Sequence, residues 1–97
     1  MYDINDLLTF AQVVKAKSFS AAAARLQVSK SRVSKSVARL EAALGVRLLQ
    51  RSTRRLSLTE IGEAYFEHCE RISEELARAD DTIARLHMEP RGTLRLS

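Results

Sequence analysis

The chain has 97 residues, of which 45% are hydrophobic, 5% are aromatic and one is a cysteine. This length suffices for one small domain with a compact core, and it excludes a large enzyme scaffold with a deep substrate cleft. A single cysteine cannot form an internal disulfide, and no uncharged stretch approaches the roughly 18 residues that a membrane helix needs. We therefore expect a soluble, cytoplasmic domain that has no contact with membranes.

The formal net charge of +4 is unevenly distributed along the chain. Residues 25–55 contain nine basic residues and one acidic residue, whereas residues 56–97 contain five basic and nine acidic residues. A basic block inside an otherwise neutral or acidic chain is typical of a protein that binds a polyanion. Charge alone is equally compatible with a basic surface that only keeps the domain soluble.

The first half of the chain predicts two helices. Apolar residues recur with a helical period over residues 3–16, and Asp3 is a candidate N-cap. An alanine-rich stretch over residues 21–26 predicts a second, short helix, with Ser20 as its N-cap. The small alanine side chains should let another helix approach closely.

A third helix is expected from about residue 30 to residue 44, capped by Ser29 and ended by Gly45. The tight turn before it, together with the short second helix, is typical of a helix-turn-helix motif. Gln27 stands in this turn where many such motifs have glycine. A left-handed backbone at Gln27 would cost about 1 kcal/mol relative to glycine.

The second half predicts a small hairpin and a long helix. Residues 46–51 and 55–58 read as two short strands joined by a turn, which would form a wing. Residues 60–88 predict a helix with Thr59 as its N-cap. The fold class is therefore mainly α with a two-stranded hairpin: a winged helix-turn-helix followed by a long linker helix.

Three segments follow from these elements. Residues 1–58 are the expected DNA-binding domain, and residues 59–89 are the expected linker and dimerisation helix. Residues 90–97 alternate apolar and polar side chains like the first strand of a further domain. We interpret the chain as part of a longer protein.

The third helix provides a candidate surface for reading DNA bases. Val33, Val37 and Leu40 should face the core. The opposite face then presents lysines, which can donate to guanine, and serines, which can bond base edges or phosphates. These base-reading candidates are Lys30, Ser31, Ser34 and Lys35. The alternative interpretation is an amphipathic surface helix with solubilising basic residues.

Further polar residues are candidates for contacts with the DNA backbone or the minor groove. A basic hairpin beside a recognition helix can straddle the backbone, and arginine senses narrow minor grooves. Helix N-termini and their hydroxyl caps can bind phosphate, although capping alone also explains them. The candidates are Ser18, Ser20, Arg32, Arg51, Thr53, Arg54 and Arg55.

The long helix carries a heptad pattern of apolar residues, with spacings that alternate between four and three. A helix of this length exceeds what the small domain can cover. Its distal part should therefore pair with a second chain, while the part near Ile61, Tyr65 and Phe66 should pack against the first helix. The expected dimer interface consists of Tyr65, Cys69, Ile72, Leu76, Ala79, Ile83 and Leu86.

No pattern indicates catalysis or a metal site. His68, Cys69 and His87 lack the spacing of metal ligands, and Cys69 is expected to be a small buried hydrophobic residue. There is no glycine-rich phosphate loop and no recognisable nucleophile with its base. We expect neither an enzyme nor a cofactor in this segment.

Five stretches of the chain form a recognisable pattern, namely residues 18–26, 33–34, 40–41, 44–51 and 58–62. Together they resemble the N-terminal domain of LysR-type transcriptional regulators. The resemblance runs from about residue 3 to residue 88, and residues 92–97 resemble the start of the family's effector-binding domain. Where many members have Gln followed by Pro or Ser, this chain has Lys30 and Ser31, and Lys35 stands where Arg is common.

This resemblance implies sequence-specific binding to double-stranded promoter DNA at a partly palindromic site. It also implies a dimer with antiparallel linker helices, a tetramer at full length, and RNA polymerase as a candidate further partner. A small-molecule effector would bind the C-terminal domain, which lies beyond this segment. The family's contacts map onto Lys30, Ser31, Ser34, Lys35, Arg51 and Arg54.

Two other functions stay open at this point. The first is a coiled-coil interaction module whose basic face is only surface, which would have no duplex affinity beyond generic charge attraction. The second is an architectural DNA binder, which would bind all duplexes equally.

Overall fold

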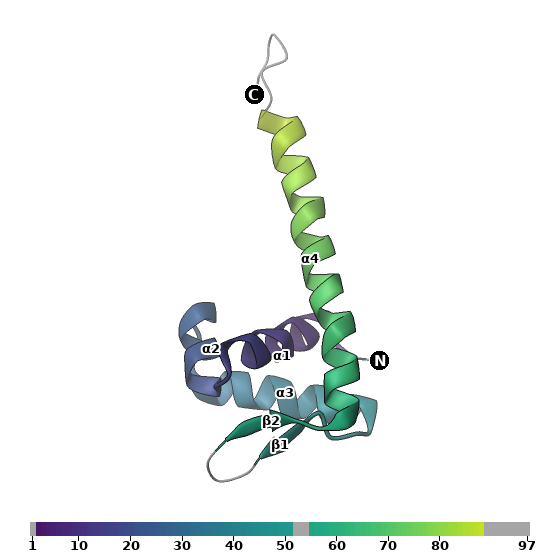
Figure 1. The fold of residues 1–97 in the computed structure, drawn as a ribbon. Helices are drawn as coiled ribbons and strands as arrows, with labels where there is room; N and C mark the ends of the chain where they lie inside the picture. Colours follow the sequence, from purple (N-terminus) through teal and green to yellow (C-terminus); the bar gives the residue numbers. More distant parts are fainter. Residues whose placement is uncertain (1, 52–54, 89–97) are drawn as a thin grey trace.

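The computed structural model describes residues 2–51 and 55–88, and four helices and one hairpin lie within them (Figure 1). The expected class, mainly helical with a two-stranded hairpin, is confirmed. The predictions for Thr53, Arg54 and residues 90–97 lie outside the described residues. The elements are α1 (Ile4–Ala16), α2 (Phe19–Leu26), α3 (Lys30–Leu44), β1 (Leu49–Arg51), β2 (Leu56–Leu58) and α4 (Glu60–Met88).

Both helices of the first half begin at polar caps. The Asp3 carboxylate accepts a hydrogen bond from the Asn5 amide at 2.9 Å, as expected for the cap of α1. The predicted cap of α2 is wrong, because Ser18 and not Ser20 occupies that position. The Ser18 backbone is extended, and its hydroxyl accepts from the Ala21 amide at 2.8 Å. The helix therefore begins at Phe19, and Ser20 lies in its first turn.

The turn between α2 and α3 has a left-handed backbone at Gln27, the case that the sequence left open. Gln27 is left-handed, with φ 59° and ψ 43°, although it has a Cβ. Ser29 caps α3, accepting from the Arg32 amide at 3.1 Å, and Gly45 ends α3 at φ 73°. These local bonds fix where the projecting helix starts and stops.

The core lies where α1, α2 and α3 pack together. The small side chains of Ala22 and Ala23 are buried, which lets α2 approach its neighbours closely. Val33, Val37 and Leu40 are at most 1% exposed, as predicted for the inner face of α3. The remaining fully buried apolar residues are Leu7, Phe10, Ala11, Val13, Leu48, Leu49 and Cys69.

Helix α4 starts against the hairpin. The Thr59 hydroxyl donates to the Arg47 carbonyl at 2.7 Å and accepts from the Gly62 amide at 2.9 Å, so Thr59 is the predicted cap. A Cβ on Gly62 would lie 2.0 Å from the Leu48 carbonyl oxygen. Glycine therefore permits the close approach that sets the direction of α4.

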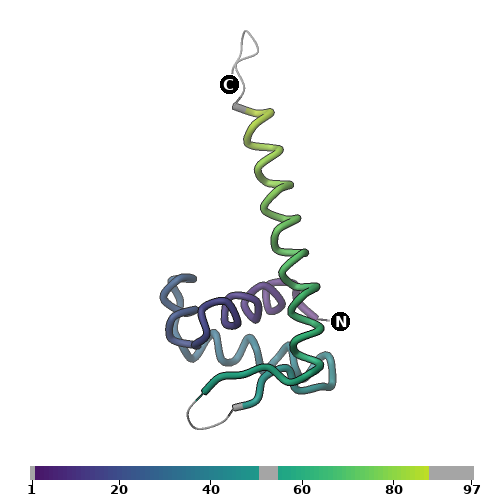
Figure 2. The backbone as a smooth tube through the Cα atoms, in the orientation of Figure 1, coloured from purple at the N-terminus to yellow at the C-terminus, as the bar shows by residue number. Residues whose placement is uncertain are grey.

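From this start α4 runs away from the domain body, as the green-to-yellow tube of Figure 2 shows. The principal extents are 58 × 24 × 21 Å, and the radius of gyration is 16.8 Å. A compact domain of about 100 residues has a radius of gyration of about 13 Å. The elongation follows from a helix of 29 residues of which only the first turns have a core to pack against.

Candidate nucleic-acid interface

The N-terminal half of α3 presents polar and basic side chains to solvent. Lys30, Ser31 and Lys35 are exposed, and Ser34 is half-buried. Arg32 is also exposed on this helix. Since the opposite face of α3 is fully buried in the core, the arrangement leaves one side of the helix free to enter a DNA groove. Base contacts by these residues stay a prediction.

A buried carboxylate fixes α3 against α1. Asp6 on α1 is 3% exposed and accepts a hydrogen bond from the Ser36 hydroxyl at 2.5 Å. The Arg39 guanidinium bonds both oxygens of Asp6, at 2.9 and 2.8 Å. Ser36 and Arg39 both lie on α3, so three hydrogen bonds set the position of this helix on α1. No periodicity in the sequence indicates a contact between residues about 30 positions apart.

The same contacts perturb the acid–base behaviour of Asp6. The hydrogen bonds from Arg39 lower the pKa of this carboxyl below its ordinary value of 3.8, and burial opposes that shift. The Ser36 hydrogen bond and the positive charge of Arg39 lower it further. Asp6 is therefore ionised at neutral pH, as the bidentate pairing with arginine requires.

A second buried carboxylate holds the other end of α3. The Glu41 side chain accepts from the Leu48 and Leu49 amides, at 2.8 and 3.1 Å. It therefore ties the end of α3 to the first strand of the hairpin. Sequence reasoning identified Glu41 only as part of a family pattern and missed this role. Together, Asp6 and Glu41 fix α3 relative to α1 on one side and to the hairpin on the other.

The hairpin carries the second group of candidate residues. Its antiparallel register pairs Leu49 with Leu58 and Arg51 with Leu56. Arg55, at the start of the returning strand, is exposed. Thr53, Arg54 and the side chain of Arg51 lie outside what the structure describes. Of the serine candidates, Ser20 is exposed and Ser18 is engaged as the cap of α2.

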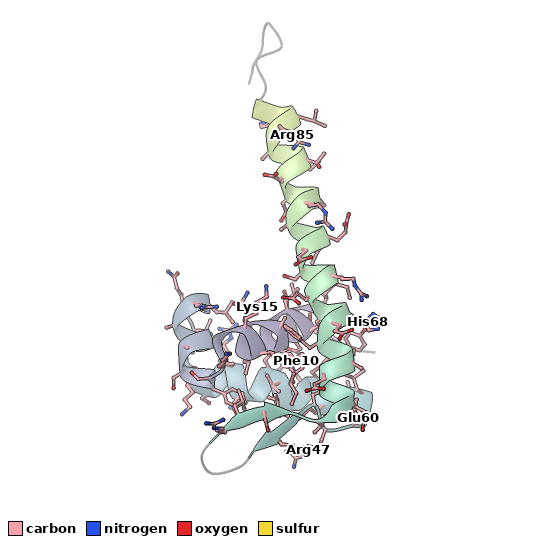
Figure 3. All side chains as sticks on the ribbon, viewed as in Figure 1. Phe10, Lys15, Arg47, Glu60, His68 and Arg85 are labelled. Carbon is pink, nitrogen blue, oxygen red and sulfur yellow. The ribbon has the colours of Figure 1, made fainter. Side chains whose placement is uncertain are left out.

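The apolar stripe of α4 divides into two parts. Cys69 is 0% exposed, and the ring centroids of Tyr65 and Phe10 lie 6.0 Å apart, so both residues of α4 pack in their own domain. Figure 3 labels Phe10 beside the first turns of α4. Burial raises the pKa of the Cys69 thiol to about 11. Because Cys69 is fully buried in the core, it cannot contact a second chain. Its inclusion in the expected dimer interface was therefore wrong. Ile61 was expected to pack against α1, which is wrong because it is 53% exposed.

No described residue outside α4 covers the distal part of the stripe. Its large members are Ile72, Leu76, Ile83 and Leu86, which are 36 to 66% exposed, and Ala79 is also exposed. Surface ion pairs such as Glu75–Arg78, at 2.8 Å, lie elsewhere on the helix. An apolar stripe beside charged faces is typical of a helix that packs against a partner.

The described parts of the chain hold no other chemistry of note. Within residues 2–51 and 55–88, no three His, Cys, Asp or Glu side chains are grouped where they could share a metal ion. In the same ranges, no helix combines the length and the hydropathy needed to cross a membrane.

Comparison with known protein families decides the assignment. Residues 4–63 match the model of the bacterial regulatory helix-turn-helix proteins of the lysR family. The chain belongs to the lysR family. The matched residues contain the whole helix-turn-helix, the hairpin and the first turn of α4, so the lysR domain coincides with the body of this fold.

Individual lysR relatives agree with this assignment. The chain is 49% identical over 96 residues to an HTH-type transcriptional regulator of Xanthomonas campestris, covering 99% of the chain and 28% of the relative. It is 48% identical over 91 residues to the regulator CrgA of Neisseria meningitidis, covering 94% and 30%. The chain thus spans less than a third of the length of these relatives.

A solved lysR structure shows the same fold. The DNA-binding domain of CbnR in a complex with DNA is 40% identical, with a TM-score of 0.73. The likeness covers 82% of this chain and 92% of that one. A winged helix-turn-helix with a long following helix is therefore common to both.

Proposed function

We propose that this chain binds double-stranded promoter DNA in a sequence-specific manner, with α3 in the major groove. The observation that carries the proposal is the two-sided character of α3. Its inner face is held by a fully buried core and two buried carboxylates, while Lys30, Ser31 and Lys35 are free on its outer face. Lysine and serine can donate to base edges in that groove.

The lysR relatives support the proposal. CbnR, whose DNA-binding domain has this fold at 40% identity, was solved in a complex with DNA. Relatives that are 41 to 49% identical carry the names of transcriptional regulators or activators. By analogy, Lys30, Ser31, Ser34 and Lys35 read bases in this chain. In the same proposal, contacts with the DNA backbone or the minor groove are made by Ser18, Ser20, Arg32, Arg51, Thr53, Arg54 and Arg55.

The chain acts as a dimer in this proposal, and the distal stripe of α4 supports that part. Four large apolar side chains are exposed along about two heptads, where a second α4 in antiparallel orientation would cover them. The proposed interface is Ile72, Leu76, Ala79, Ile83 and Leu86, flanked by Tyr65. A two-fold dimer presents two copies of α3, which suits a partly palindromic site.

The regulatory function belongs to a longer protein in this proposal. The chain spans about 30% of the CrgA regulator, so most of such a protein would lie outside the DNA-binding domain. That remainder would hold a small-molecule effector and support a tetramer, with RNA polymerase as a further partner. The DNA-binding domain itself uses no cofactor, because its proposed task needs only hydrogen bonds and charge.

Retardation of a promoter duplex and of its scrambled counterpart, at physiological salt, tests the proposal. We expect the parent chain to bind the promoter at least tenfold more tightly, since specific sites exceed non-specific ones by large factors. The double variant Lys35→Ala, Arg54→Ala should lose about tenfold or more of the promoter affinity. The matched control, Arg78→Ala with Arg85→Ala, removes two exposed cations from α4 and should bind like the parent.

Three results would contradict the proposal in different ways. If the double variant Lys35→Ala, Arg54→Ala binds the promoter as tightly as the parent, α3 and the hairpin do not form the DNA-binding surface. A parent chain that binds neither duplex would favour the coiled-coil interaction module. Equal affinity for promoter and scrambled duplex would favour an architectural binder.

A further inference from the structure

A groove of about 340 Å³ lies along one flank of α3, between this helix and the first turns of α1. Its apolar lining residues belong to α2, to the turn after it and to α3: they are Leu26, Val28 and Val33. The lining residues from α1 and its cap are all polar, namely Asp3, Asn5, Asp6 and Thr9. On this flank, contact between α1 and α3 therefore depends on polar groups.

The hydrogen bonds of Asp6 connect the two sides of this groove. The Ser36 hydroxyl donates to Oδ1 of Asp6 at 2.5 Å, while Nε and Nη2 of Arg39 donate to Oδ2 and Oδ1 at 2.9 and 2.8 Å. By contrast, the Thr9 hydroxyl donates within α1, to the Asn5 carbonyl at 2.8 Å. Asp6, Ser36 and Arg39 thus form a clamp, the Asp6 clamp, that joins α1 to α3 across the groove.

The inner side of α3 is held by apolar packing, which constrains its rotation less than directional bonds do. Val33, Val37 and Leu40 are at most 1% exposed. Their burial is non-directional, so it opposes separation of the helices more strongly than a small rotation of α3 about its own axis. A rotation of about 10° moves a side chain about 6 Å from the axis by about 1 Å. A recognition contact tolerates only about 0.5 Å, so a directional bond on the flank decides whether the geometry is productive.

We infer that Ser36 and Arg39 are positioning residues for base reading by α3, and that both act through Asp6. The inference rests on the proposed function. Ser36 is 7% exposed and faces Asp6, so it has no surface to offer a duplex. The Arg39 side chain is 65% exposed, but two of its nitrogens are held by Asp6, whose own side chain is 4% exposed. Lys35 directly precedes Ser36 and lies one turn before Arg39, so the clamp fixes the rotation of α3 where bases are to be read.

Ser36→Ala tests the inference at a residue that DNA cannot reach. The variant removes one bond of the clamp and leaves every charge in place. We expect the affinity for the promoter duplex to fall severalfold. The affinity for the scrambled duplex and its dependence on salt should stay at the parent's values, because phosphate attraction is independent of sequence. Retardation of both duplexes over a range of salt, below the unfolding transition of each protein, measures these quantities.

Arg39→Lys tests the second positioning residue in the same experiment. It keeps the positive charge but replaces the planar fork, which bonds both oxygens of Asp6, with a point charge. The promoter affinity should fall by about tenfold, which is the discrimination that one good base contact supplies. The matched control is Arg78→Lys, because Nε and Nη2 of Arg78 bond Glu75 on the exposed surface of α4, at 3.3 and 2.8 Å. This control should bind both duplexes like the parent.

The ratio of promoter affinity to scrambled affinity separates positioning from a purely structural role. A clamp that only stabilises the fold lowers the Tm of a variant but leaves this ratio unchanged while the variant is folded. If folded Ser36→Ala and Arg39→Lys keep the parent's ratio, the inference is wrong and the proposed function stands. If Arg39→Lys does not fold, the ratio measured for Ser36→Ala decides alone.

Two further results would also overturn the inference. If Arg39→Gln weakens both duplexes equally and lowers the slope of log affinity against log salt by about 0.9, while Arg39→Lys binds like the parent, Arg39 contacts a phosphate instead. If the parent binds no duplex, or binds both equally, the proposed function is wrong and the inference with it.

Discussion

At the scale of single residues, the fold depends on buried polar groups that bond several partners at once. Asp6 is the clearest case, since one carboxylate accepts three hydrogen bonds from two residues of α3. A buried carboxylate without such partners would be strongly unfavourable. With them, it fixes the position of α3 more narrowly than apolar packing alone, because hydrogen bonds are directional.

Asp6→Asn should destabilise the domain by about 2 kcal/mol at neutral pH, since it removes the charge that Arg39 and Ser36 bond. The pKa of Asp6 is lower in the folded chain than its ordinary 3.8. Its stabilising contribution is therefore complete above that value and is lost as the pH falls through the lower folded-state pKa. Urea unfolding of parent and variant between pH 7 and pH 2.5 measures this difference.

The difference in unfolding free energy between parent and Asp6→Asn should be constant near neutral pH and should shrink below about pH 4. Asp81→Asn, at an exposed carboxylate of α4, serves as the control and should cost little at any pH. If the difference in unfolding free energy between parent and Asp6→Asn stays the same down to pH 2.5, the charge of Asp6 does not stabilise the fold.

At the scale of elements, the sequence predicted the helices and strands of residues 2–51 and 55–88, but it did not predict all of their boundaries and neighbours. Helix caps were readable because they are local: Asp3, Ser29 and Thr59 each bond an amide two or three residues ahead. Two serines flank Phe19, and either can cap a helix of alanines, so local chemistry could not choose Ser18 over Ser20. The anchors at Asp6 and Glu41 join distant residues, and no periodic pattern reveals them.

Helix α4 shows a different limit of sequence reasoning. Its heptad pattern continues from Tyr65 to Leu86, yet its first part packs on α1 and its last part has no partner among the residues that the structure describes. A periodic stripe identifies which face of a helix is apolar, not which partner covers it. Cys69 therefore fitted the stripe but proved to be a core residue.

Leu76→Lys should convert a dimer of this chain into a monomer, because it places a charge in the middle of the exposed stripe. Sedimentation equilibrium at several protein concentrations measures the change. Glu74→Lys is the control, because it introduces the same side chain about 200° around the helix from Leu76, away from the stripe. It changes the net charge by more than Leu76→Lys does, yet this variant should remain a dimer. An unchanged dimer in Leu76→Lys would exclude this stripe as the interface.

At the scale of the whole molecule, a small compact body carries one long arm. The body is stabilised around α3, and the arm extends away from it over about 43 Å for a helix of 29 residues. Two such chains joined through their arms would hold two copies of α3 at a fixed separation. Half-sites on the duplex should then be spaced by one or more helical turns of roughly 10 base pairs.

Selection from random duplexes tests whether α3 reads DNA sequence. The full chain is equilibrated with a random library at physiological salt, and the bound duplexes are sequenced after successive rounds. If α3 reads bases in a two-fold dimer, one short half-site should be enriched, present twice in inverted orientation at a constant spacing. Bound duplexes that share no sequence would contradict base reading by Lys30, Ser31, Ser34 and Lys35.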